Sequence, residues 1–538
     1  MERRVNTFEE TSTSPNRKEI KNMKRITLFL IGLLLFLTQP LVHAEVTLPR
    51  VIGSNMVLQR DMQVPIWGWA SAGEEVTITL SAEAESVEPV STTTAVADAE
   101  GNWQTKLPAM AAGGPYTLRV TGSNTLELTN VLFGEVWVCS GQSNMQWSVS
   151  ASNDSEAEIA AAMYPKIRLF YVPRVPSGLL QQDVTADWSE TTPETVANFS
   201  AVAYYFGRKL YKNLDVPIGL INTSWGGTRI EPWTPPVGFA AVPALASISK
   251  EVQDIQTNYQ AQLPQKMKDI EAWIAETREA LETGAQLTLM PNNTHPLTHQ
   301  QRPTALYNGM VHPIVPYAMR GALWYQGESN LREGMLYHEK MKALINGWRE
   351  VWGQGDFPFY FVQLAPFNYG GRNASPFFLP KIWEAQTATL ALPNTGMAVT
   401  TDIGNLRDIH PRNKQEVGRR LALWALAKTY GRDDVTHSGP LYKSMAVEGN
   451  AIRLSFDATG SGLMSRDEAP LTWFQIAGED KEFVEAQATI NGDTLVVSSE
   501  TVENPVAVRF GWHQSAEPNF VNKEGLPASP FRTDSWEK

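Results

Sequence analysis

The sequence has 538 residues, of which 43% are hydrophobic and 19% charged, with a formal net charge of −12. This composition indicates a globular chain with a sizeable core and room for two to four domains, and it excludes a disordered or fibrous protein. The acidic balance argues against nucleic acid as a partner, because binding nucleic acid requires a positively charged surface.

The N-terminal residues 1–44 predict an export signal. Met23 opens a short basic stretch, the apolar run ITLFLIGLLLFL follows, and small residues end at Ala44. Such a pattern is typical of a secretory signal peptide, and Met23 is its expected start because the preceding segment is polar. The apolar run is short for a bilayer span, and an uncleaved anchor helix is the alternative. We therefore expect cleavage after Ala44, a periplasmic or secreted protein, and no stable membrane association afterwards.

The mature chain divides into three regions by its hydrophobic pattern. Residues 45–130 contain strand-like segments such as QVPIWGWA and EEVTITLSA between turn residues, which predict a small β-sandwich domain. Residues 131–438 alternate strands with amphipathic helices, which predicts a parallel sheet covered on both faces. A polar insertion at about 242–289 favours helix, and we expect an exposed helical hairpin there. Residues 439–538 return to β-type segments and predict a C-terminal β-rich domain.

The stretch GEVWVCSGQSNMQW, residues 134–147, places a serine just beyond a predicted central strand. Ser143 follows Gly141 in a polar loop, where backbone N–H groups can turn outward. Such a serine can attack a carbonyl and help to hold the resulting oxyanion. An ordinary turn is the alternative. Cys139, in the same strand, is the only cysteine in the sequence, so no internal disulfide is expected.

Four polar loops follow predicted strands of the parallel sheet, and their sequences are GQSNM, WGGTRIEPW, GESN and GNLRDIHP. Ligands of open parallel sheets bind beyond the carboxyl ends of the strands. We therefore expect all four loops at one edge, where they would form an active site.

His410, in the last of these loops, is the candidate general base. It could take the Ser143 proton while Asp408 orients the ring, and Asp402 or a backbone carbonyl are alternative orienting groups. A helix-capping Asp408 beside a surface histidine is the non-catalytic alternative, and Pro411 could open the following helix. His312 has apolar neighbours and is interpreted as a buried structural histidine.

A metal site is not expected. His295 and His299 have a spacing that suits a metal on a helix, but Pro296 argues against that helix. One cysteine and no clustered His/Asp set leave no other candidate.

These blocks carry a family resemblance. GEVWVCSGQSNMQW, SWGGTRIEPW, ALYNGMVHP with WYQGESN, DIHPRNKQEVGRRLA and the early LPRVIGSNMVLQRDMQVPIWGWA resemble the signature blocks of bacterial sialate O-acetylesterases, within the SGNH-type hydrolases. The resemblance implies a flavodoxin-like three-layer α/β core with flanking β-sandwich domains. The sequence departs from the general SGNH pattern at Arg407, where that pattern has Asp, and at Ser329, where it has Asn.

The resemblance also implies a serine esterase that uses Ser143 and His410. The oxyanion donors would be the Ser143 backbone N–H, the backbone of Gly226 or Gly227, and a side chain of the WYQGESN loop, for which Gln326 and Glu328 are the candidates. The site would remove acetyl groups from a sugar through an acetyl-enzyme and would need no cofactor.

The expected partner is an O-acetylated glycan, with O-acetylated sialic acid as the first choice. Gln142 and Asn144 are candidate substrate contacts beside Ser143. Arg229 could meet a sugar carboxylate, unless it pairs with Glu231. Acetylated xylan or pectin is the alternative substrate. An inactive glycan-binding protein with lectin-like β-domains is the alternative of another class, and the presence of both Ser143 and His410 counts against it.

Overall fold

The computed structural model describes residues 45–82 and 88–536. The export signal predicted at 1–44 lies outside the described residues. Within the described ranges, no helix combines the length and the apolar character needed to cross a membrane.

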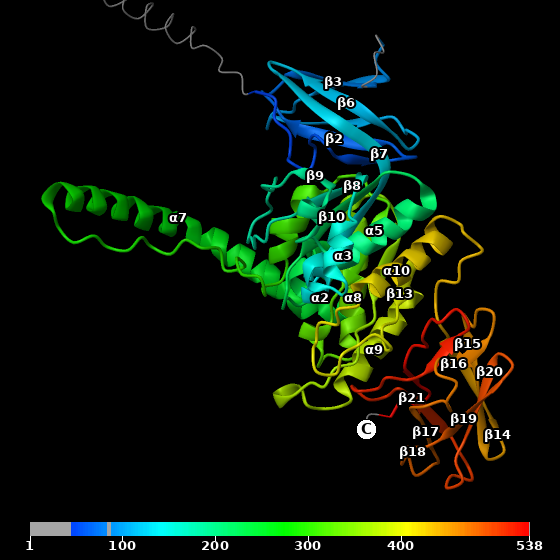
Figure 1. The fold of residues 1–538 in the computed structure, drawn as a ribbon. Helices are drawn as coiled ribbons and strands as arrows, with labels where there is room; N and C mark the ends of the chain where they lie inside the picture. The colour runs from blue at the N-terminus through cyan, green and yellow to red at the C-terminus, as the bar shows by residue number, and fades with distance from the viewer. Residues whose placement is uncertain (1–44, 83–87, 537–538) are drawn as a thin grey trace, which may run out of the picture. The chain divides into compact units, whose positions relative to one another are not determined.

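A twisted, largely parallel sheet lies at the centre of the fold, with β7 (Thr125–Gly141) in its middle (Figure 1). β7 pairs in parallel with β10 on one side and β11 on the other, and within the strand order given next the edge strand β9 runs antiparallel to its neighbour β8. The strand order is β13-β12-β11-β7-β10-β8-β9. The predicted parallel sheet is therefore confirmed. The other strands are β8 (Tyr164–Tyr171), β9 (Trp188–Thr191), β10 (Ile218–Ser224), β11 (Gly321–Tyr325), β12 (Phe359–Val362) and β13 (Thr395–Ala398).

The order of the parallel strands differs from the flavodoxin-like order that the resemblance implied. Numbered along the chain, the parallel strands β8, β10, β7, β11, β12 and β13 lie in the order 2-3-1-4-5-6, whereas a flavodoxin-like sheet has 2-1-3-4-5. The first strand lies between the third and fourth here. After β7 the chain adds β10 and β8 on one side of this strand and then crosses to add β11, β12 and β13 on the other side. The topological switch point, where the direction of strand addition reverses, therefore lies at the carboxyl end of β7.

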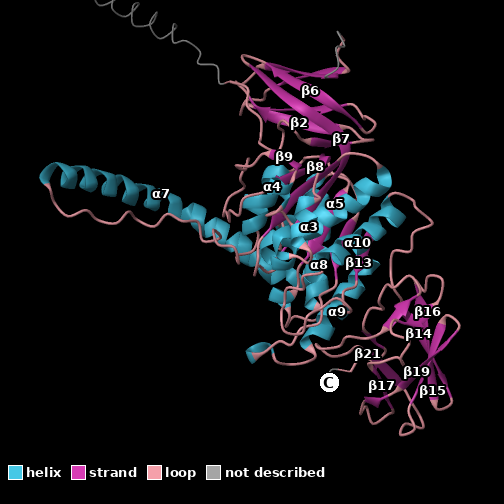
Figure 2. Cartoon of the chain, viewed as in Figure 1, coloured by secondary structure: helices cyan, strands magenta, loops and turns pink. Residues whose placement is uncertain are grey.

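Helices cover both faces of this sheet (Figure 2). On one face the ring of Trp424 packs against Tyr360 of β12, with ring centroids 6.3 Å apart. On the other face Trp348 packs against Phe359, the preceding residue of the same strand, at 6.0 Å. Successive strand residues point to opposite faces, so each helix covers a different side. Trp424 belongs to α10 (Lys414–Trp424), which packs against α5 (Ala201–Leu214), and Trp348 belongs to α8 (Leu336–Trp352).

The N-terminal β-region and the central sheet share β7. The first half of β7 pairs antiparallel with β6, where Leu126 faces Val120, and its second half pairs with β10 from Glu135 onward. The boundary predicted at residue 130 therefore falls inside one strand, and a single hydrophobic core runs through both regions. The other strands of this region are β1 (Val57–Gln59), β2 (Val64–Trp69), β3 (Glu75–Ala82), β4 (Ser91–Val96), β5 (Asn102–Leu107) and β6 (Gly113–Thr121).

The insertion forms one long helix, α7 (Ala246–Thr283), and not the predicted hairpin. The whole helix-favouring run stays in this helix, which ends at Gly284 in a left-handed conformation with φ 70°. The chain then returns beside α7 without forming a second helix (Figure 1), and Trp273 Nε1 donates to the Thr288 carbonyl at 3.0 Å. Proline and asparagine residues in the returning segment, such as Pro291 and Pro296, disfavour helix there.

The C-terminal β-region has a hydrophobic core of its own. It joins the α/β region through polar contacts, among them Gln363 Nε2 donating to Ser529 Oγ at 2.8 Å and the ion pair of Arg532 with Glu384 at 2.8 Å. Its strands are β14 (Leu441–Glu448), β15 (Ala451–Asp457), β16 (Leu463–Ser465), β17 (Phe474–Ala477), β18 (Val484–Glu485), β19 (Gln487–Asn491), β20 (Thr494–Ser498), β21 (Ala507–Phe510), β22 (Phe520–Asn522) and β23 (Phe531–Arg532).

Short helices complete the α/β region. They are α2 (Ser143–Gln146), α3 (Ser155–Ala160), α4 (Pro193–Val196), α6 (Pro236–Ala240) and α9 (Phe378–Ala388).

Candidate active site

Ser143 lies at the carboxyl edge of the sheet, where β7 ends at Gly141 and α2 begins. Gly141 has φ 143°, and a Cβ at this position would stand 2.2 Å from the Tyr325 carbonyl oxygen. Only glycine fits this close approach to β11. The tight passage turns the chain sharply out of the central strand and leaves Ser143 at the start of a helix.

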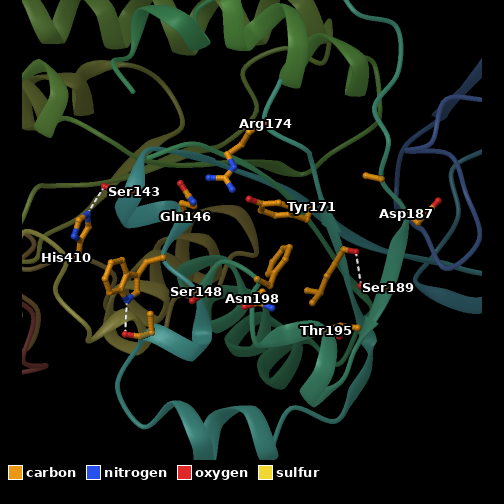
Figure 3. Close-up of a pocket in the computed structure, with 15 residues that line it drawn as sticks. Ser143, Gln146, Ser148, Tyr171, Arg174, Asp187, Ser189, Thr195, Asn198 and His410 are labelled. Atoms are coloured by element: carbon orange, nitrogen blue, oxygen red, sulfur yellow. Dashed lines mark hydrogen bonds between the residues drawn. The ribbon is translucent and has the colours of Figure 1, made fainter. Parts of the chain in front are cut away.

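The His410 ring faces Ser143, as the sequence predicted for a nucleophile and its base. Nε2 of His410 lies 2.9 Å from Oγ of Ser143 (Figure 3), although the two residues are 267 positions apart. The ring of Trp147 stacks on the imidazole, with centroids 4.8 Å apart and an interplanar angle of 14°. Partial burial, helped by the nearby charge of Lys414, lowers the pKa of His410 below its ordinary value. The imidazole is therefore neutral at pH 7 and able to accept a proton.

Asp408 is the carboxylate that faces the other ring nitrogen. Its Oδ1 lies 3.7 Å from Nδ1 of His410 and accepts the His410 backbone N–H at 2.9 Å. The first distance is too long for a hydrogen bond, but catalytic hydrogen bonds often tighten only when substrate is bound. Asp402, the predicted alternative, has both carboxylate oxygens 2.7 Å from the guanidinium of Arg420. The Asp402 carboxylate is therefore bound to a side chain of α10 and not to His410.

Gly226 is the glycine of the WGG loop that lies against the nucleophile. A Cβ on Gly226 would stand 3.3 Å from Cβ of Ser143. Its backbone N–H donates a hydrogen bond to the side-chain carbonyl oxygen of Gln146, Oε1, at 2.6 Å. This N–H group can therefore bind a carbonyl oxygen beside the serine. The Gly227 carbonyl instead accepts from Gln301 Nε2 at 2.8 Å. A Cβ on Gly227 would meet no atom within 4 Å, so of the two predicted glycines it is Gly226 whose backbone lies against Ser143.

The predicted donors from the WYQGESN loop have other partners. Gln326 is fully buried, and its Nε2 donates to Asn330 Oδ1 at 2.8 Å and to the Thr228 carbonyl at 3.2 Å. Glu328 accepts a hydrogen bond from Asn144 and so offers no donor of its own. Neither residue lines the cavity above Ser143. The geometry does not support an oxyanion role for either side chain, because both are bonded to neighbouring loop residues and lie outside the cavity lining.

Gln142 and Asn144, the predicted substrate contacts, are buried and hold neighbouring loops. Oε1 of Gln142 accepts the backbone N–H groups of Gly327 and Ser329, each at 3.3 Å. Nδ2 of Asn144 donates to Glu328 Oε1 at 2.6 Å and to the Ile409 carbonyl at 3.1 Å. These side chains position the catalytic loops and do not face the substrate cavity.

A buried lysine that the sequence did not single out completes this support. Nζ of Lys414 lies 2.5 Å from Oδ1 of Asn144, and the side chain is fully buried. Burial lowers the pKa of Lys414 to about 7, and burial raises the pKa of Glu328. Lys414 begins α10, with Asn413 as the helix N-cap, whereas the sequence predicted Pro411 at that start. A lysine in the first turn of an amphipathic helix is usually solvated, which is why no sequence signal marked it.

A cavity of about 740 Å³ opens above the Ser143–His410 pair (Figure 3). Figure 3 shows the Arg174 guanidinium pointing into it, toward Gln146 and Tyr171. Among the residues that the structure describes, no hydrogen bond or ion pair engages this guanidinium. Arg174 follows β8, so it comes from a loop at the same sheet edge that the sequence analysis did not consider.

Arg229, the predicted carboxylate partner, lies outside this cavity. Its guanidinium pairs with Glu231 at 2.8 Å and with Glu333, and Glu231 also pairs with Lys340 at 2.7 Å. The alternative that the sequence left open, pairing with Glu231, is the one in the structure. Arg229 stabilises the loops after β10 and β11.

The other histidines do not enter the site. His312 is only half-buried, and its Nδ1 lies 2.7 Å from the Gln181 carbonyl. Nδ1 of His295 accepts the Leu297 backbone N–H at 3.1 Å. In the described part of the chain, no group of three or more His, Cys, Asp or Glu side chains could hold a metal ion.

The chain is similar to known proteins in both sequence and fold. Residues 133–427 match the family described as carbohydrate esterase, sialic acid-specific acetylesterase. The chain is 34% identical over 528 residues to the sialate O-acetylesterase of Mus musculus, covering 89% of this chain and 93% of that protein. It is 30% identical over 526 residues to the sialate O-acetylesterase of Homo sapiens, covering 89% and 91%. A crystal structure of a carbohydrate acetylesterase from Xanthomonas citri superposes with a TM-score of 0.76 at 37% identity, covering 91% of this chain and all of that one.

Proposed function

The chain belongs to the family of sialic acid-specific carbohydrate acetylesterases, and on that premise we propose that it removes O-acetyl groups from sialic acids by serine catalysis. The observation that carries the proposal is the 2.9 Å contact between Ser143 Oγ and His410 Nε2 beneath the cavity. A carbohydrate esterase of this family needs a nucleophile, a base and room for a sugar at one place. These elements meet at the carboxyl edge of the sheet.

In the first half of the reaction, Oγ of Ser143 attacks the carbonyl carbon of the acetyl ester while its proton passes to Nε2 of His410. The oxyanion that forms takes hydrogen bonds from the N–H groups of Gly226 and Ser143. Gln146 Oε1, which accepts from Gly226 in the absence of substrate, gives way to this oxygen. The sugar oxygen then leaves with the proton from His410, and an acetyl-enzyme remains.

In the second half, water attacks the acetyl-enzyme and gives its proton to His410. Collapse of the second tetrahedral intermediate breaks the bond to Ser143, returns the proton to Oγ and releases acetate. The negative charge of Asp408 beside Nδ1 stabilises the imidazolium formed in each half. The serine proton leaves with the sugar hydroxyl and a proton of the water replaces it on Oγ, and the acetic acid ionises to acetate and a proton. The cycle therefore consumes one ester and one water and needs no further reagent.

The preference for an acidic sugar rests on Arg174. A sialic acid carries a carboxylate, and a guanidinium that lines the cavity without a protein partner can bind it in a bidentate manner. Acetylated xylan has no such group on its backbone.

An SGNH-type core is the fold we propose for the α/β region, in a variant whose first strand lies between the third and fourth.

Acetate release tests this proposal directly. We would incubate the protein and its Ser143→Ala variant with O-acetylated sialic acid and with acetylated xylan, and measure acetate. We expect release from the sialic acid ester by the parent protein alone. Preferential release from xylan would transfer the assignment to plant polysaccharides, and equal release by the Ser143→Ala variant would refute serine catalysis at this site.

We further propose export, with cleavage after Ala44, because residues 23–44 have the pattern of a signal peptide. N-terminal sequencing of the protein recovered from the periplasm or medium should begin at Glu45. A mature protein that begins elsewhere, or one retained in the membrane, would contradict this proposal.

A further inference from the structure

A second cavity, of about 610 Å³, is lined mostly by the C-terminal β-region and shares no lining residue with the first. We call it the Trp473 pocket, and the residues used here are Phe377, Trp473, Gln475, Glu485, Arg509 and His513. Its size lies within the range of sites that hold small ligands. No step of the proposed esterase reaction uses it.

Two large aromatic side chains stand open to solvent in this pocket. Trp473 and Phe377 are each 40% exposed, whereas most large aromatic residues of the protein are buried. They come from different regions, since Trp473 precedes β17 and Phe377 precedes α9. Exposed aromatic surface that lines a pocket costs solvation free energy and usually marks a binding site.

The backbone of Trp473 is unfavourable for its residue type. Its φ is 65°, in the left-handed region that glycine adopts readily and a bulky side chain rarely does. The Trp473 carbonyl accepts the Gly511 backbone N–H at 3.0 Å, and its ring stacks on His513 at 5.9 Å and 23°. Trp473 therefore lines the pocket from an unfavourable backbone conformation, and such strain commonly accompanies function.

Polar groups with spare hydrogen-bonding capacity surround these rings. Within the described residues, the side chains of Gln475 and Glu485 have no hydrogen bond or ion pair to the protein. Nδ1 of His513 accepts the Ser515 backbone N–H at 3.1 Å, which leaves Nε2 as a donor. The pocket thus combines flat apolar faces with an amide, a carboxylate and an imidazole.

The charges select a neutral ligand. Arg509, the positive residue of the pocket, is paired with Asp534 through two contacts of 2.9 Å. Burial lowers the pKa of His513, so this ring is uncharged at neutral pH. The Glu485 carboxylate would repel an anionic sugar, but it accepts hydrogen bonds well from hydroxyl groups.

We propose that the Trp473 pocket binds a neutral pyranose unit of a glycan, with one C–H face of the ring packed on Trp473 and its hydroxyls bonded to Gln475, Glu485 and His513. The pocket is a second carbohydrate site, separate from the esterase cavity. It would hold the neutral part of a glycan on the same chain that deacetylates it. The binding itself does not depend on the proposed esterase function.

Calorimetric titration of the full chain with lactose and with xylotetraose, both neutral and free of ester, tests this inference. We expect saturable binding of at least one of them. Trp473→Gly should weaken it at least about tenfold, because the stacking surface is lost, and Gln475→Ala should weaken it without altering the backbone. Val447→Ala, a change of a 54% exposed side chain outside the pocket, is the matched control and should bind like the parent.

Two further measurements keep the test decisive. Glycine accepts φ near 65°, which offsets part of the packing lost with the indole, so Trp473→Gly should still show a single cooperative unfolding transition in urea. Hydrolysis of 4-nitrophenyl acetate should stay unchanged in this variant. The inference is overturned if neither sugar binds, if only an acidic sugar such as sialyllactose binds, or if binding survives both substitutions. Loss of ester hydrolysis in Trp473→Gly would also overturn it, since the pocket would then be part of the esterase structure.

Discussion

Nζ of Lys414 lies 2.5 Å from Oδ1 of Asn144, the residue that directly follows Ser143. The same amide donates to the carbonyl of Ile409, the residue that directly precedes His410. One buried side chain therefore links the serine loop, the histidine loop and the first turn of α10. This amide is one of several contacts between the two loops, beside the stacking of Trp147 on His410 and the hydrogen bond from the Asn153 backbone N–H to the Arg412 carbonyl.

The buried side chains around Asn144 predict how a substitution of Lys414 changes the stability of the protein. Lys414→Met removes the ammonium and leaves the Glu328 carboxylate, whose Oε2 is already buried without a hydrogen-bond partner. Lys414 and Glu328 are linked through Asn144 and not by a direct ion pair, so the cost is chiefly that of leaving the buried Asn144 Oδ1 without its donor, about 1–3 kcal/mol of unfolding free energy. We expect urea denaturation to show a loss of that order for Lys414→Met.

The double variant Lys414→Met, Glu328→Gln is the control for this prediction. It should be less destabilised than Lys414→Met alone, because no uncompensated charge remains. If the two single losses simply added, the two charges would be energetically independent and the coupling through Asn144 would have to be abandoned.

Catalysis by the pair predicts strongly non-additive kinetics. Ser143→Ala and His410→Ala should each reduce kcat by roughly 10⁴- to 10⁶-fold, and the double variant should be no slower than the slower single variant. Acetate release under single-turnover conditions measures each rate, and circular dichroism checks the fold. Multiplicative losses would mean that the two residues act in separate steps.

The environment of His410 predicts the acid limb of the pH profile. The ring must be neutral to accept the serine proton, so kcat/KM should fall as the pH drops through the pKa of His410. Partial burial and Lys414 place that pKa below 6.5, and the half-maximum should therefore lie below pH 6.5.

Asp408→Asn tests the role of the neighbouring charge. Asp408 raises the pKa of His410 against the effect of burial, so its removal should move the half-maximum to still lower pH. The asparagine retains an oxygen for the His410 backbone N–H, and kcat should fall by about 10²-fold or more if the charge stabilises the imidazolium. An unchanged kcat together with an unshifted limb would exclude Asp408 from the reaction.

The parts of the fold that follow from local patterns were predictable from the sequence. The apolar strand of residues 135–139, the helix-favouring runs and the polar loops after each strand have periodicities that do not depend on distant residues. The meeting of Ser143 and His410 followed from the rule that parallel strands end at one sheet edge. Strand order did not follow, because nothing in the local pattern of β7 records that β10 and β11 flank it.

The roles of Gln142, Asn144 and Arg229 required the structure. Proximity to Ser143 in the sequence suggested substrate contacts, but the first turn of α2 points Asn144 inward, to Glu328 and Lys414. Direction around a helix turn decides whether a polar side chain faces the cavity or the core. Arg229 had a suitable charge in a suitable loop, and only the positions of Glu231 and Glu333 reveal that it is already paired.

Arg174 and Arg229 give a matched pair of variants that tests the substrate class. If Arg174 binds the carboxylate of a sialic acid, Arg174→Gln should lower kcat/KM for an O-acetylated sialic acid by about 10- to 100-fold, the value of one charge-assisted hydrogen-bonded contact. Most of the loss should appear in KM, because the carboxylate is remote from the reacting ester. Hydrolysis of acetylated xylose, which lacks a carboxylate, should be unaffected. Arg229→Gln removes the same charge outside the cavity, and any loss through the loops that it stabilises should be equal for the two substrates, so their ratio of kcat/KM values should stay at the parental value. If Arg174→Gln lowered kcat/KM equally for the charged and the neutral substrate, Arg174 would shape the cavity without recognising the carboxylate. The assignment of sialic acid as substrate would then lose its structural support.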